Sequence, residues 1–175
     1  MASLKERHQT AVANRLIKNL ALPAMFVREG DHIKNEPDVI YSYQGELLGI
    51  EVGDAYYSNS LAKGQWDIAR RKIDAPPRTV IFWDVDSADD TICAQIQKEV
   101  DKKCSRKPYS GVDRVWLCVE QQALIIGERD TVLECVKRLR ISTGHGFEKI
   151  FLHYLAPDEG GQWHSIELWP EQPQG

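Results

Sequence analysis

The chain has 175 residues, a formal net charge of −4 and no low-complexity tract. This length and composition are typical of one globular domain with a continuous core, and they argue against a disordered chain. The longest apolar stretches are strand-sized and the N-terminus lacks a secretory signal, so we expect a soluble cytoplasmic protein without a membrane partner. Because net charge is negative, any contact with a nucleic acid must be local.

The N-terminal segment has the pattern of a capped helix. Ser3 is a candidate N-cap, Glu6 follows three residues later as its capping-box partner, and apolar residues then recur at helical spacing. We therefore predict a helix over residues 3–20, which ends before Pro23.

Three short extended segments follow, and the last two form a predicted hairpin. Gln44 and Gly45 separate them, which is the spacing of a tight two-residue turn. The hairpin spans residues 38–52, with Asp38 at its beginning and Glu51 near its end. Antiparallel pairing could therefore bring the two carboxylates together.

Helices and strands alternate along the remainder of the chain. This order predicts a single domain over residues 1–175 of the α/β class, with a mixed central sheet that helices flank. The predicted elements are a helix over 60–73, a strand over 79–85, a helix over 86–104, a strand over 114–120, a helix over 130–142, strands over 148–155 and 164–170, and a flexible tail over 171–175.

The four cysteines are widely spaced and form neither a CxxC pair nor a zinc pattern. In a cytoplasmic protein this usage predicts reduced, mostly buried thiols. The cysteines in question are Cys93, Cys104, Cys118 and Cys135.

Asp38 and Glu51 are also the residues that suggest chemistry. Two carboxylates that meet suit a hard divalent ion such as Mg²⁺, which prefers oxygen ligands and leaves positions open for phosphate and water. Such an ion polarises a phosphodiester and lowers the pKa of the attacking water.

The helix, the hairpin sequence NEPDVIYSYQGELLGIEVGDAYY and the segment AKGQWDIARRK together resemble the PD-(D/E)xK restriction-endonuclease-like superfamily. The resemblance covers about the first 75 residues. It implies a restriction-endonuclease-like fold, with Mg²⁺ or Mn²⁺ bound by Asp38 and Glu51 at a catalytic site. It also implies that Glu6 on the first helix could be a further metal ligand, for which helix capping is the competing role.

The sequence departs from the family pattern at Gly53, where the motif has its catalytic lysine. In some branches a lysine from the following helix takes this role, so Lys63 is the expected substitute, with Gln65 and Arg70 behind it. An exposed surface lysine is the alternative interpretation of Lys63. A further basic cluster of Lys102, Lys103 and Lys107 could face a phosphate backbone or form a solvated helix end.

The resulting expectation is a metal-dependent nuclease that hydrolyses phosphodiester bonds of DNA or RNA. The alternative is a non-catalytic binding or assembly module that retains the nuclease fold, which Gly53 and the acidic balance favour. Many nucleases of this fold act as dimers, so the resemblance also allows a homodimer. A third possibility is that the resemblance is accidental and the chain is another small α/β domain, since fold class alone never fixes function. The site hypothesis fails if Asp38 and Glu51 face opposite sides of the sheet, beyond reach of one ion.

Overall fold

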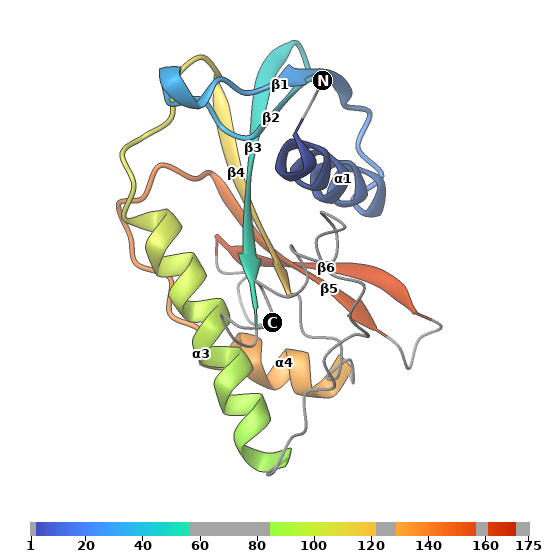
Figure 1. Ribbon diagram of the computed structural model, residues 1–175, viewed down its shortest axis with the longest axis vertical. Helices are drawn as coiled ribbons and strands as arrows, with labels where there is room; N and C mark the ends of the chain where they lie inside the picture. The colour runs from blue at the N-terminus through green and yellow to red at the C-terminus, as the bar shows by residue number, and fades with distance from the viewer. Residues whose placement is uncertain (1–2, 57–84, 122–128, 157–160, 171–175) are drawn as a thin grey trace.

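The computed structural model describes residues 3–56, 85–121, 129–156 and 161–170, and at its centre is a six-stranded sheet (Figure 1). The strands lie side by side in chain order, from β1 at one edge to β6 at the other. β3, β4 and β5 run parallel, whereas the remaining neighbours are antiparallel. The strands are β1 (Met25–Glu29), β2 (Val39–Tyr43), β3 (Glu46–Ala55), β4 (Arg114–Gln121), β5 (Lys149–Ala156) and β6 (Gln162–Trp169).

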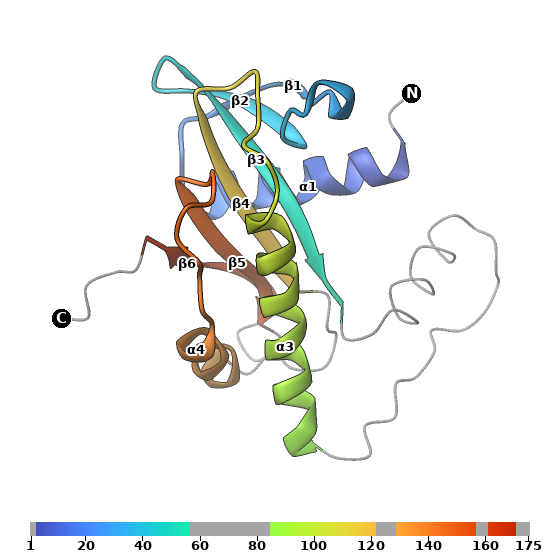
Figure 2. The ribbon, with the colours of Figure 1, turned by 90° about the vertical axis from the view of Figure 1, so that its left-hand side faces the viewer.

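Helices cover both faces of this sheet (Figure 2). The helix α1 (Leu4–Asn19) packs on one face, and α3 (Val85–Cys104) and α4 (Arg129–Arg138) pack on the other. A short 3₁₀ helix, η1 (His32–Lys34), precedes β2. The predicted α/β class with a mixed sheet between helices is therefore confirmed. Residues 60–73, nearly all of 79–85 and the tail 171–175 lie outside the described residues.

The first helix forms where the cap and the apolar stripe predict it. The Ser3 side chain accepts a hydrogen bond from the backbone of Glu6, and the Glu6 carboxylate accepts one from the backbone of Ser3. One face of the helix is buried at helical spacing and packs on the sheet, which is the main source of helix stability in a globular protein. The buried residues are Gln9, Val12, Ala13, Leu16 and Ile17. No helix in the described ranges is long and apolar enough to cross a membrane.

Strand alternation divides the side chains of β3 between two cores. Ile50 and Val52 belong to the core under α1, so Glu51 and Gly53 face the opposite side, where α3 lies. The tight turn at Gln44 and Gly45, both with positive φ, fixes the register of β2 against β3.

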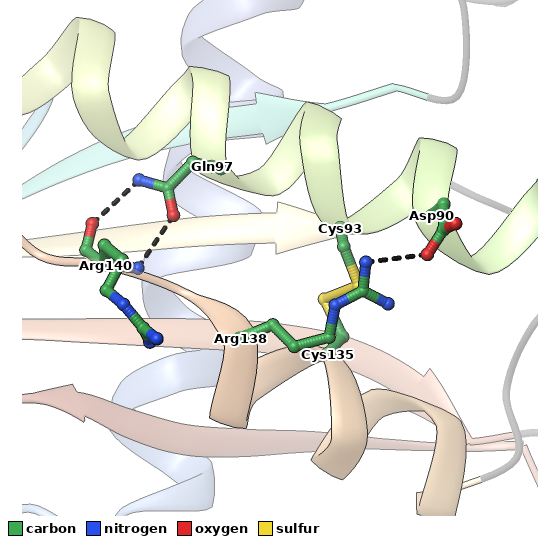
Figure 3. The surroundings of a disulfide bond; sticks show 6 residues. All are labelled: Asp90, Cys93, Gln97, Cys135, Arg138 and Arg140. Atoms are coloured by element: carbon green, nitrogen blue, oxygen red, sulfur yellow. Dashed lines mark hydrogen bonds and ion pairs between the residues drawn. A yellow bond between two sulfur atoms is a disulfide. The ribbon is translucent and has the colours of Figure 1, made fainter.

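Two predicted boundaries are wrong by three or more residues because tertiary contacts override local sequence. β3 was expected to end at residue 52 but continues to Ala55, because β4 supplies a parallel partner along that stretch. The helix expected over 130–142 ends at Arg138. There the side-chain amide of Gln97 accepts a hydrogen bond from the backbone N–H of Arg140 and donates one to its carbonyl, which holds Arg140 outside the helix (Figure 3).

The prediction of reduced thiols is wrong for two of the four cysteines. Cys93 on α3 and Cys135 on α4 form a disulfide, while Cys104 and Cys118 are free (Figure 3). The two linked residues are 42 positions apart in sequence, so no local spacing of cysteines predicts the pair. Packing of α3 against α4 brings their Cα atoms to 5.4 Å, which is within the range for a disulfide.

We expect the Cys93→Ser/Cys135→Ser double variant to lose about 2–4 kcal/mol of unfolding free energy, because the cross-link closes a long loop. Calorimetry with and without reductant measures the effect. The Cys104→Ser variant is the matched control and should keep both the wild-type midpoint and its sensitivity to reductant. Equal midpoints for the double variant and the wild type would show that the bond contributes nothing to stability.

Candidate functional site

Asp38 and Glu51 lie on the same face of the sheet and line the same pocket. Val39 pairs with Ile50 in the antiparallel register, so Asp38 stands one residue further along, across from Glu51. Both side chains are almost completely buried. The hairpin therefore brings together the two carboxylates that the sequence singles out, and the arrangement on opposite faces that would have separated them does not occur.

The Asp38 carboxylate is buried next to a second carboxylate. Its Oδ2 accepts a hydrogen bond of 2.8 Å from the backbone N–H of Val52, and His32 Nε2 lies 3.7 Å from its Oδ1. Burial, followed by the negative charge of Glu51, raises the pKa of Asp38 to about 6. A carboxyl group with a raised pKa beside a second carboxylate is a common feature of functional sites, because ordinary folding does not require it.

A lysine from α3, rather than from the motif position, contacts the acidic pair. Lys103 Nζ lies 2.5 Å from Glu51 Oε1 and 2.6 Å from the carbonyl oxygen of Val52. Gly53 leaves room for this helix, since a Cβ at that position would lie 2.9 Å from Cγ of Glu99. Because Gly53 has no side chain, two side chains of α3, Glu99 and Lys103, can lie next to this part of β3.

The two carboxylates face a pocket with a volume of about 500 Å³. Its wall is strongly charged and combines acidic residues from the sheet with basic residues from α3 and the segment after it. Arg106 Nη1 reaches Glu51 Oε1 at 3.1 Å, and its side chain is about half exposed. The lining residues are Lys5, Gln9, His32, Asn35, Glu36, Asp38, Glu51, Val52, Asp54, Ala55, Tyr56, Gln95, Lys98, Glu99, Lys102, Lys103, Arg106 and Tyr109.

The other predicted site residues do not join this pair in the described structure. Glu6 caps α1 and does not line the pocket, so the capping role holds for this residue. Gln9, one turn further along α1, is buried and lines the pocket instead. A polar residue within the apolar stripe of the helix is the sequence signal that could have identified it. Lys63, Gln65 and Arg70 lie outside the described residues.

The donor atoms around Asp38 and Glu51 fit a hard divalent cation. Both side chains offer carboxylate oxygens, and the carbonyl of Val52 points to the same ammonium group as Glu51. The oxygen atoms of this set suit Mg²⁺ or Mn²⁺ and the set contains no sulfur, while the imidazole of His32 lies beside it, 3.7 Å from Asp38 Oδ1. Lys103 already occupies a cation position between two of these oxygens, so an incoming ion would share or displace its contacts.

Comparisons with protein families, with curated proteins and with solved structures find no match for this chain. The chemistry of the pocket is therefore the basis on which the function is inferred.

Proposed function

We propose that this protein is a metal-dependent nuclease that hydrolyses phosphodiester bonds of DNA or RNA. In this proposal it is a branch of the PD-(D/E)xK restriction-endonuclease-like superfamily whose catalytic lysine comes from α3. Asp38 and Glu51 would bind Mg²⁺ or Mn²⁺, and Lys103 would take the role that the motif assigns to the position of Gly53.

The observation that carries this proposal is the convergence of three side chains in one open pocket. Asp38 immediately precedes β2 and Glu51 lies on the adjacent strand β3, and Lys103 reaches Glu51 from a helix more than fifty residues away. An ion pair with no function could occur anywhere in the fold. Placing two carboxylates and an ammonium together in a large polar pocket matches the needs of phosphoryl chemistry.

Each residue of the chain has a definable task in this scheme. Asp38 and Glu51 hold the cation, which when bound supplies Lewis-acid activation of the phosphodiester and of water. The Lys103 ammonium, fixed by Glu51 and the carbonyl of Val52, can stabilise negative charge that develops on a phosphate oxygen. Arg106 is exposed enough to contact a phosphate of the substrate.

Incubation of the purified protein with plasmid DNA, single-stranded DNA and RNA, each with Mg²⁺ or Mn²⁺, tests the proposal. We expect cleavage that chelation abolishes and that the Asp38→Asn variant lacks. The matched control is Asp113→Asn, which replaces an exposed carboxylate that accepts a hydrogen bond from the backbone of Leu47 and does not line the pocket. Cleavage that persists in Asp38→Asn, or its absence on every substrate, would contradict the proposal.

A second function is favoured by the position of the Lys103 ammonium. The ammonium contacts Glu51 and the carbonyl of Val52, so it can neutralise the buried carboxylate without a metal ion. A non-catalytic binding module would use Lys103 in this way. Binding of Mn²⁺ distinguishes the two functions, measured by electron paramagnetic resonance at increasing metal concentration. Saturable binding that Asp38→Asn removes supports the nuclease. No binding supports the module, in which Lys103 replaces the metal permanently.

A further inference from the structure

A second cluster of metal-ligating side chains lies on the other face of the sheet, under α1. His8 comes from α1, Asp54 from β3 and Glu120 from β4, and one donor atom from each lies within 4.8 Å of the others. His8 Nε2 is 2.8 Å from Asp54 Oδ1. None of the three is among the proposed nuclease residues Asp38, Glu51 and Lys103, and strand alternation directs Asp54 and Glu51 to opposite faces, although Asp54 also lines the edge of the large pocket.

The sheet itself holds two of the three donors in place. Asp54 and Glu120 are direct partners in the parallel register of β3 and β4, so their side chains lie next to each other on one face. Arg15 from α1 donates a hydrogen bond to Glu120 Oε2. A carboxylate fixed by a neighbouring donor is the usual support for a metal ligand, because its orientation is set before the ion arrives.

A buried imidazole extends the same row of polar side chains. His153 on β5 is the direct partner of Glu120 in the register of β4 and β5, and it is 0% exposed. Its Nδ1 lies 2.9 Å from Ser165 Oγ, while its Nε2 has no hydrogen-bond partner among the described groups. This buried imidazole therefore adds a third polar side chain beside Asp54 and Glu120 in the same row across the sheet.

The cluster is accessible to an ion from solvent. The side chains of His8 and Asp54 are 24% and 22% exposed, whereas Glu120 is 2% exposed. Asp54 also lines the large pocket, so an ion could enter there. One imidazole and two carboxylates suit zinc and related transition ions better than Mg²⁺, and three protein ligands leave a coordination position open.

We propose that His8, Asp54 and Glu120 form a binding site for a divalent transition-metal ion of the zinc type. The ion would link α1 to β3 and β4 on the face opposite Asp38 and Glu51. The proposal does not depend on nuclease activity, since it rests on different residues on a different face of the sheet.

The test uses the full chain carrying Asp38→Asn, which removes one of the two carboxylates of the proposed nuclease site. The result therefore does not depend on whether the nuclease proposal is correct. After dialysis against Zn²⁺, elemental analysis of this protein should give about one zinc per chain. Adding His8→Gln should weaken zinc binding by at least about tenfold, because mutation of residues that only orient the metal ligands already has an effect of this size. His32→Gln is the matched control, which removes a histidine beside Asp38 and should retain the zinc.

A second experiment looks for a new absorption band in another variant, so it is informative even if His8→Gln folds poorly. With Co²⁺ as the probe, His8→Cys should add a thiolate-to-cobalt charge-transfer band in the near ultraviolet that the parent protein lacks. Absence of that band overturns the proposal. It is equally overturned if the Asp38→Asn protein retains no zinc, or if His8→Gln retains as much as His32→Gln does.

Discussion

The Lys103→Met variant should be less stable than the wild type by about 3–5 kcal/mol and should cleave no substrate, because it leaves a buried carboxylate without its main partner. The side chains of Lys103 and Glu51 are 7% and 3% exposed, so water cannot replace the lost ammonium. Arg106 remains 3.1 Å from Glu51, which should hold the loss near the lower end of this range. Chemical denaturation measures the stability, and the plasmid assay measures the activity.

Lys102→Met provides the matched control for this prediction. Lys102 is the next residue on the same helix, but its side chain is 55% exposed and it pairs with Glu99. Its loss should change stability by less than about 1 kcal/mol, as for other exposed ion pairs. The double variant Glu51→Met/Lys103→Met should regain much of the stability without activity, since it removes both charges. If Lys103→Met and Lys102→Met have the same unfolding free energy, Lys103 is not the partner that stabilises the buried Glu51 carboxylate.

The Asp38→Asn variant should be more stable than the wild type above pH 6 although it is inactive. Burial and the charge of Glu51 raise the pKa of Asp38 from its ordinary value of 3.8 to about 6, so ionisation of this group opposes folding. The difference between these pKa values corresponds to about 3 kcal/mol, and we expect a gain of about 1–3 kcal/mol. The asparagine oxygen can still accept the hydrogen bond from Val52.

The sign of this effect gives it a distinctive pH profile. A raised pKa means that the folded protein holds the Asp38 proton more tightly than the unfolded chain does. The contribution of Asp38 to stability is therefore largest at low pH and falls between about pH 4 and 6. Unfolding free energies of the wild type and Asp38→Asn should converge near pH 4 and separate up to pH 6, beyond which the gap is constant. Parallel curves over this whole range would contradict the prediction.

Local pattern was sufficient for much of the fold. The Ser3 and Glu6 cap predicts the start of α1, because both groups of a capping box lie within one turn of the chain. The turn at Gln44 and Gly45 predicts the hairpin, and its two-residue length determines which residues face each other. This same register places Asp38 across from Glu51, so the carboxylate pair is the part of the site that sequence can predict.

The sequence does not identify the lysine that contacts this carboxylate pair. Lys103 is one of several lysines near the end of α3, and the sequence alone does not say which of them turns toward the sheet. Helix phase and packing decide this, because only Lys103 is buried among the lysines of the described residues, whereas the side chain of Lys102 is exposed. The expectation placed on Lys63 remains a prediction, since that residue lies outside the described ranges.

Sequence by itself thus determined the α/β class, the first helix and the hairpin with its two carboxylates, because each depends on residues close together in the chain. Tertiary structure alone decided the contact of Lys103 with Glu51, the link between Cys93 and Cys135, and the meeting of His8 with Asp54 and Glu120. In each case the partners come from elements that are distant in sequence. Their approach is set by how helices pack on a sheet, which no local pattern encodes.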